Sequence, residues 1–203
     1  MRRRLMLRNA SGGGLPSGYR QVRCISIPLG GYIITDVIAV KGDVITADAR
    51  LDSDLSLNSI NPIYSSYNGA GNMAVFALER NQKPYAQYNF RYSCIGSNDN
   101  LRHVSVLDTN NNLLRFDDLQ ANIGCEGDTT SKIALSGRYN GNGTVDRKTA
   151  TTFWRFSVFN GGIAKCDYVP CEQISSGLFG MYDLTTNTFY GNSGTGQITE
   201  GVE

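Results

Sequence analysis

The segment from Asp43 to Leu51 alternates between two kinds of side chain, and this pattern constrains the fold more than any other feature of the chain. Ile45, Ala47, Ala49 and Leu51 fall on one side of an extended backbone, and the residues between them fall on the other. A period of two is typical of a half-buried β-strand. No window of a dozen residues keeps apolar side chains at helical spacing. We therefore expect an all-β protein.

A second strong signal is a hairpin near residue 160. Thr152 to Phe159 predicts a strand with Trp154, Phe156 and Val158 on one face, and Ile163 to Val169 predicts its partner. Asn160-Gly161-Gly162 supplies a turn that tolerates positive φ. Further strands are predicted at 32–38, 73–79, 84–90, 101–107, 112–116, 132–137, 178–182 and 187–190. Many short strands joined by Asn- and Gly-rich turns indicate a sandwich or barrel.

The basic residues are distributed unevenly. Arg2, Arg3, Arg4 and Arg8 precede a stretch at 9–18 with three consecutive glycines and a proline, which predicts a flexible hinge. We divide the chain into a basic arm with its hinge, 1–14, and one all-β domain, 15–203. We interpret the arm either as a disordered terminus or as a segment that binds an acidic surface of a partner.

The remaining composition excludes several classes. Residues 24–203 carry 13 basic and 18 acidic side chains, a net charge of −5, so we expect no binding of nucleic acid by bulk charge. No apolar stretch approaches the roughly 20 residues of a membrane helix. The run Leu5-Met6-Leu7 is far shorter than the apolar core of a secretory signal, so we expect neither a signal nor a membrane span.

The five cysteines predict no metal ribbon and no full disulfide framework, because their number is odd and no CxxC pair is present. We read them as buried, reduced thiols, as in a protein made in a reducing cytoplasm. Whether Cys166 and Cys171 approach each other is left open by the sequence.

Two groups of residues resemble a known family. The first is Leu15-Pro16-Ser17-Gly18-Tyr19-Arg20-Gln21-Val22, followed by Gly31-Tyr32-Ile33-Ile34-Thr35-Asp36. The second is Asp167-Tyr168-Val169-Pro170-Cys171, then Ser176-Gly177-Leu178-Phe179-Gly180-Met181-Tyr182-Asp183, Phe189-Tyr190 and Gly194-Thr195-Gly196. They resemble the opening and closing motifs of LamG-like (concanavalin A-like lectin/glucanase) domains in phage and prophage virion proteins of gut bacteria.

This resemblance implies a two-sheet antiparallel jelly roll in a virion context. It implies that the arm binds other virion proteins of the capsid or tail. Such proteins are commonly homo-oligomers, trimers among them. The resemblance places the protein in the virion, after synthesis in the cytoplasm of the bacterial host. From the residues themselves we expect most motif positions to be scaffold, with Pro170 ending the pairing of its strand.

Catalytic chemistry is poorly represented in the sequence. His103 is the only histidine, and it lies on a predicted strand, so we expect no hydrolytic triad and no enzyme. The predicted strands offer no carboxylate pair at the spacing that glycoside hydrolysis uses. We expect no cofactor. A loop calcium site at Asp52, Asp54 or Asp128 is an alternative to solvated loop acids.

Aromatic residues are the remaining candidates for a binding role. Tyr64, Tyr67, Tyr85, Tyr88 and Tyr92 lie in one region of the sequence, and exposed tyrosine rings stack on sugars. They predict either a groove that contacts host surface glycans or ordinary core packing. The functional hypothesis is a virion structural protein, a head or tail fibre or decoration component, with glycan adhesion. The alternatives are a lectin-like adhesin of a bacterial cell surface and, less favoured, a glycan hydrolase.

Overall fold

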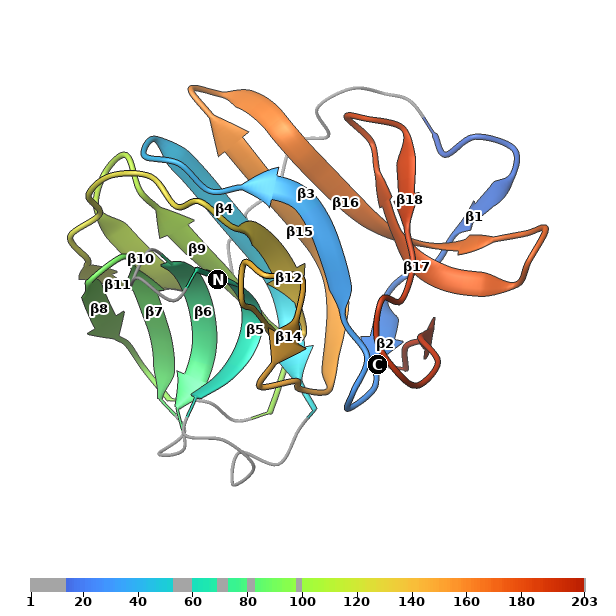
Figure 1. Cartoon of the computed structure of the whole chain (residues 1–203), viewed down its shortest axis with the longest axis horizontal. Coiled ribbons are helices and arrows are strands. Elements are labelled where there is room, and N and C mark those ends of the chain that lie inside the picture. The colour runs from blue at the N-terminus through green and yellow to red at the C-terminus, as the bar shows by residue number, and fades with distance from the viewer. Residues whose placement is uncertain (1–13, 53–59, 69–72, 80–82, 98–99, 203) are drawn as a thin grey trace.

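The structure is a computed structural model that describes residues 14–52, 60–68, 73–79, 83–97 and 100–202. Every regular element within these ranges is a β-strand, which confirms the all-β prediction. The strands form two sheets, A and B, that lie face to face as a sandwich, while the end of sheet A with β16, β17 and β18 extends beyond sheet B (Figure 1).

Sheet A runs in the order β11-β10-β9-β4-β15-β16-β17-β18, with β1 beside β16 and β2 between β15 and β19. Its strands are β1 (Tyr19–Gln21), β2 (Ile25–Ile27), β4 (Asp43–Leu51), β9 (His103–Asp108), β10 (Leu113–Phe116), β11 (Leu119–Asn122), β15 (Thr151–Asn160), β16 (Ile163–Gln173), β17 (Leu178–Asp183), β18 (Thr188–Tyr190) and β19 (Thr199–Glu200). All of these pairings are antiparallel.

Sheet B runs in the order β14-β13-β5-β6-β7-β8, and β12 joins β5 to β3. Its strands are β3 (Ile33–Ile38), β5 (Ile60–Tyr67), β6 (Met73–Glu79), β7 (Pro84–Tyr88), β8 (Arg91–Cys94), β12 (Lys132–Leu135), β13 (Arg138–Tyr139) and β14 (Val145–Asp146). The short contact between β13 and β5 is parallel, and the other pairings of this sheet are antiparallel.

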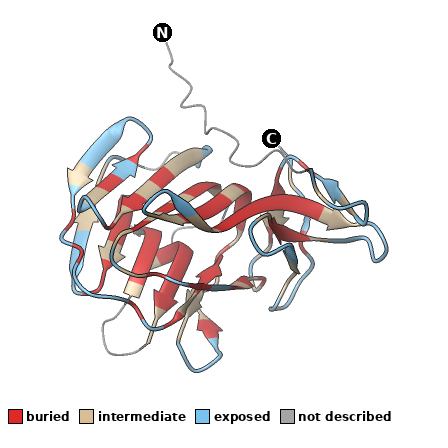
Figure 2. Cartoon of the chain, turned by 90° about the horizontal axis from the view of Figure 1, so that it is seen from above, coloured by how far each residue is buried: buried red, intermediate tan, exposed pale blue. Residues whose placement is uncertain are grey.

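Aromatic rings join the two sheets across the core. Tyr64 of β5 meets Phe156 of β15 with ring centroids 5.4 Å apart, and Phe76 of β6 stacks on Phe116 of β10 at 5.9 Å. The buried residues gather on the central strands, whereas the hairpin ends are exposed (Figure 2). Burial of such large apolar side chains is the main force that holds the sheets together.

The alternating segment forms the strand that its pattern predicts. β4 spans Asp43 to Leu51, and its predicted inner residues Ile45, Ala47 and Ala49 are buried with Leu51. β6 also has the predicted bounds, 73–79. The period-two signal of β4 and the continuous apolar run of β6 therefore located two central strands correctly.

β5 is a strand that the sequence did not predict. Its residues Asn61, Pro62, Ser65 and Ser66 are polar or lack a ladder donor, yet all four are buried. A β-bulge between Pro62 and Tyr64 lets the proline lie inside the strand. Polar side chains buried on both faces of one strand remove the alternation on which the prediction depends.

The prediction that Trp154 lies on the same face of its strand as Phe156 and Val158 is wrong. A bulge between Phe153 and Arg155 adds one residue to β15, so Phe153 takes the inner position and the indole lies on the outer face of sheet A. Bulges re-aim side chains in this way, and nothing local in the sequence marks the position of this one.

The prediction that Pro170 ends the pairing of its strand is also wrong. β16 continues to Gln173, and Pro170 lies opposite Met181. On its other side β16 pairs with β15 as far as Tyr168 and with β1 from Cys171 onward. Pro170 therefore lies at the junction between two neighbours, where its missing N–H costs no ladder hydrogen bond.

The first and last motifs of the sequence meet in sheet A. β1 pairs with β16, and the ring of Tyr19 lies 4.7 Å from that of Tyr182 and 5.7 Å from that of Phe189. Val169 and Cys171 complete this apolar cluster. The predicted arrangement, in which the closing strands lie near the N-terminal strand, is confirmed.

Candidate ligand-binding pocket

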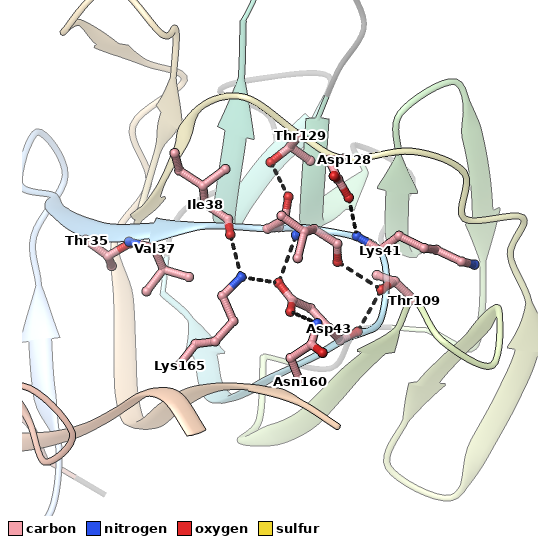
Figure 3. Close-up of polar contacts among 12 residues, drawn as sticks. Thr35, Val37, Ile38, Lys41, Asp43, Thr109, Asp128, Thr129, Asn160 and Lys165 are labelled. Atoms are coloured by element: carbon pink, nitrogen blue, oxygen red, sulfur yellow. Dashed lines mark hydrogen bonds and ion pairs between the residues drawn. The ribbon is translucent and has the colours of Figure 1, made fainter. Parts of the chain in front are cut away.

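A buried ionic cluster closes one end of the sandwich (Figure 3). Oδ2 of the fully buried Asp43 accepts hydrogen bonds from Lys165 Nζ and from the backbone N–H of Val40, both at 2.8 Å. Its Oδ1 accepts from Asn160 Nδ2 at 2.8 Å. Lys165 also donates to the carbonyl of Ile38 on β3, at 2.8 Å. The cluster therefore ties the two sheets together beside the β3–β4 turn.

The same turn positions the loop that precedes β12. The Thr129 hydroxyl donates to the carbonyl of Ala39 at 2.8 Å, and the backbone N–H of Lys41 donates to Asp128 Oδ1 at 2.7 Å. Lys41 Nζ donates to the carbonyl of Cys125 at 2.6 Å. These bonds attach the loop to the β3–β4 turn at several points.

A depression of about 320 Å³ lies between the β7–β8 turn and this loop. It is lined by Tyr88, Asn89, Phe90 and Arg91 on one side and by Glu126, Gly127 and Asp128 on the other. Its volume lies at the lower end of the range that small-molecule sites occupy.

Asn89 holds the two sides of the pocket together. It adopts a left-handed backbone with φ of 51°, which a tight hairpin turn requires and which asparagine tolerates. Its Oδ1 accepts from the backbone N–H of Met73 at 3.1 Å, and its Nδ2 donates to the carbonyl of Glu126. The Tyr88 hydroxyl donates to the carbonyl of Gly127 at 2.9 Å. The walls of the pocket are therefore preorganised.

The open side of the pocket combines an aromatic ring with charged groups. Phe90 is 74% exposed, and Arg91 Nη2 lies 4.0 Å from Glu126 Oε1 with both side chains largely in solvent. Burial raises the pKa of the Tyr88 hydroxyl, which therefore stays a neutral donor. An exposed ring beside donors and acceptors is suited to a ligand that has both apolar faces and hydroxyl groups.

The pleat of sheet B places the five predicted tyrosines on two opposite faces of the sheet. Tyr64 and Tyr88 are fully buried in the core, so their rings follow the core-packing alternative and cannot stack on a glycan. Positions 85 and 88 are an odd number of residues apart on one strand and therefore face opposite sides. Tyr85 packs in a small cluster outside the main core, and Tyr67 lies opposite Met73 of that cluster.

Tyr92 is the tyrosine of this group that remains available to a ligand. It is 70% exposed, and its ring stacks on that of Tyr85 at 6.0 Å. The stacking holds the exposed ring in a fixed orientation on the outer face of sheet B. The ring of Tyr67 is covered instead by the guanidinium of Arg138, whose Cζ lies 4.7 Å from the ring centroid.

Other predicted site residues have varied positions. Arg2, Arg3, Arg4 and Arg8 of the anchoring arm lie outside the described residues, as does Asp54. Asp52 accepts hydrogen bonds from Arg50 and Thr152, both at 2.6 Å, and Asp128 accepts from Lys41. In the described part of the chain no three His, Cys, Asp or Glu side chains gather as metal ligands would.

The cysteines and the single histidine have structural surroundings. None of the five cysteines forms a disulfide, and all except Cys94 are buried. Burial raises the pKa of the Cys125 thiol to about 11 and that of Cys171 to about 12. His103 Nδ1 lies 2.6 Å from Asp117 Oδ2, and the imidazole packs 4.4 Å from the ring of Phe116.

Sequence reasoning did not identify the pocket residues Phe90, Arg91 and Glu126. The pocket joins two segments that are far apart in the chain, and only the β7–β8 turn had a local signal, the tolerance of Asn89 for left-handed angles. No protein-family model matches the chain, and no curated protein matches it either. No helix in the described ranges is long and apolar enough to cross a membrane.

Proposed function

We propose that this chain is a virion structural protein of a bacteriophage, a LamG-like jelly-roll module that contacts host glycans through the pocket beside Phe90. The observation that carries the glycan role is the preorganised depression with an exposed ring at its rim. Its volume suits one or two sugar rings, and Phe90 offers an apolar face on which a sugar can stack.

Exposure of such rings supports a recognition role. Burying the ring of Phe90 would favour folding, yet the hairpin holds it 74% exposed, and Tyr92 nearby in the sequence is 70% exposed. Exposed aromatic residues beside a preformed pocket are typical of binding surfaces. The hydrogen bonds of Asn89 and Tyr88 keep the pocket open without a ligand, so little conformational entropy is lost on binding.

The virion assignment rests on the motifs at the two ends of the domain and on the basic arm. Motif residues of β1 and β16 pair in sheet A, and Tyr19, Val169 and Tyr182 belong to one apolar cluster, as scaffold residues of a shared fold would. In this proposal the arm, residues 1–14, anchors the domain on an acidic surface of the capsid or tail, and the domain projects outward as part of a homo-oligomer.

The glycan role is tested on an array of bacterial capsule and mucin glycans, with and without calcium. We expect Phe90→Ala to lose binding while its thermal unfolding stays within error of the parent protein. Ile163→Ala is the matched control, because Ile163 is equally exposed, at 75%, at the start of β16 and does not line the pocket. Absence of binding by the parent protein at high concentration, or unchanged binding by Phe90→Ala, would contradict the proposal.

The virion role has its own test. Immunogold electron microscopy of purified particles, with antibody raised against residues 15–203, should label the capsid or the tail. Deletion of residues 1–14 should give a folded domain that no longer assembles onto particles. Normal incorporation of the truncated protein would refute anchoring by the arm. Absence of label, with the protein present in the lysate, would favour the cell-surface lectin instead.

A further inference from the structure

The outer face of sheet A carries an indole N–H without an acceptor. The bulge in β15 places Trp154 on this face, where it is 8% exposed. Its Nε1 is buried and has no hydrogen-bond partner among the described residues. Buried donors are nearly always satisfied in folded proteins, so an orphan of this kind indicates an acceptor that arrives from outside the chain.

Two guanidinium groups lie against the same indole ring. Cζ of Arg102 is 4.6 Å from the ring centroid, and Cζ of Arg50 is 5.8 Å from it. Arg102 forms a bidentate ion pair with Asp48, at 2.7 and 2.5 Å. Arg50 donates only its Nε to Asp52, at 2.6 Å, and its terminal nitrogens have no acceptor in the described ranges. Unused N–H donors on β4 and β15 therefore lie close together.

We propose that Trp154 and Arg50 form a binding site for a carboxylate. One carboxylate oxygen accepts from the indole Nε1, and the other accepts from a terminal nitrogen of Arg50. The planar guanidinium is suited to a planar carboxylate. Because Asp48 and Asp52 neutralise much of the local charge, the site selects by directed N–H donors and not by a general positive potential.

Access to the buried indole N–H requires a side chain beside it to move. The side chain of Arg102, which lies over the ring, is 44% exposed, and turning it away would break its ion pair with Asp48. Arg155, on the same face, is held by Asp167 at 2.8 and 2.5 Å. The carrier of the carboxylate is an acidic sugar such as a uronic acid, an assignment that rests on the proposed glycan role.

The chain contains a single tryptophan, so fluorescence excited selectively in tryptophan and not in tyrosine reports on this site alone. The full-length protein is titrated with glucuronate, with sulfate and with glucose at constant ionic strength. We expect a saturable change in Trp154 fluorescence with glucuronate, a much weaker response to sulfate and none to glucose. Arg50→Gln should raise the Kd for glucuronate at least tenfold. Arg20→Gln is the control, because Arg20 is an exposed arginine that pairs with Glu172 and Glu200.

A second variant separates binding from folding. Trp154→Phe keeps an aromatic ring but removes the N–H, so it should fold normally and show no heat of glucuronate binding by calorimetry. An equal response to sulfate, an equal response to glucose, or an unchanged Kd in Arg50→Gln would overturn the carboxylate site. Phe90→Ala should leave this fluorescence response intact, so failure of the glycan array and failure of this site are separate results.

Discussion

Replacing Lys165 by methionine tests how far the ionic cluster around Asp43 stabilises the sandwich. Methionine keeps most of the side-chain volume and removes the ammonium group. Asp43 is completely buried and would keep only the donors of Val40 and Asn160, both at 2.8 Å. Removing one partner of a buried ion pair costs about 3–5 kcal/mol. Because the Lys165 side chain is 29% exposed, we expect a loss near the lower limit, about 3 kcal/mol.

Lys132→Met provides the matched control. Lys132 Nζ lies 2.6 Å from Asp36 Oδ1, so the two pairs have similar geometry, but these side chains are 44% and 65% exposed. An exposed pair contributes about 0–1 kcal/mol. Urea unfolding followed by circular dichroism gives both free energies of unfolding, provided that the slope with denaturant is unchanged.

A double substitution separates the charge from the packing. Asp43→Asn combined with Lys165→Met removes both charges and should recover part of the loss, which gives a favourable coupling energy in the double-mutant cycle. A loss of less than about 1 kcal/mol for Lys165→Met, equal to that of the exposed control, would refute the reasoning that burial makes this pair important.

Three further outcomes are expected. The guanidinium of Arg138 lowers the pKa of the Asp146 carboxyl, so this pair stabilises the fold above the usual pKa of the carboxyl and its contribution is lost as the pH falls. Asp146→Asn should therefore reduce the acid sensitivity of urea unfolding, by less than about 1 kcal/mol because the carboxyl is 42% exposed. Burial raises the pKa of Cys171 to about 12, so mass spectrometry after treatment with a thiol reagent should find Cys94 modified in the native protein and Cys171 only after unfolding. A Cβ on Gly180 would overlap a backbone carbonyl of β18, so Gly180→Ala should lower the free energy of unfolding by about 1–3 kcal/mol.

The sequence was most informative where one face of a strand is apolar and the other polar. β4 follows this rule, and its bounds were predicted correctly. The bounds of β6 were also predicted correctly, but from a continuous apolar run. β5 is buried on both faces with polar residues such as Asn61 and Ser65, so its pattern is that of a loop. The bulge at Trp154 is fixed by the register with β4, which depends on residues a hundred positions away. Local periodicity contains no information about such long-range register.

The candidate sites depend even more on tertiary contacts. The sequence singled out aromatic residues around β7, but Tyr85 and Tyr88 lie on opposite faces of that strand, so Tyr88 is buried in the main core and Tyr85 packs outside it. Phe90 lines the pocket because the β7–β8 hairpin ends beside the loop that precedes β12. The hydrogen bond between Lys41 and Asp128 holds that loop in place. Residue type therefore supplies only candidates for a contact, whereas the fold determines which rings reach solvent.

The position of β2 has a consequence for the order of synthesis. β2 pairs with β15 and with β19, so Ile25 lies opposite both Phe153 and Glu200. A ribosome makes β2 early and must then add well over a hundred residues before its first partner exists. The edges of β2 therefore remain unpaired until β15 has been synthesised, which favours slow folding and transient association with chaperones. Sheet A is complete only when the last strand of the described chain, β19, has left the ribosome.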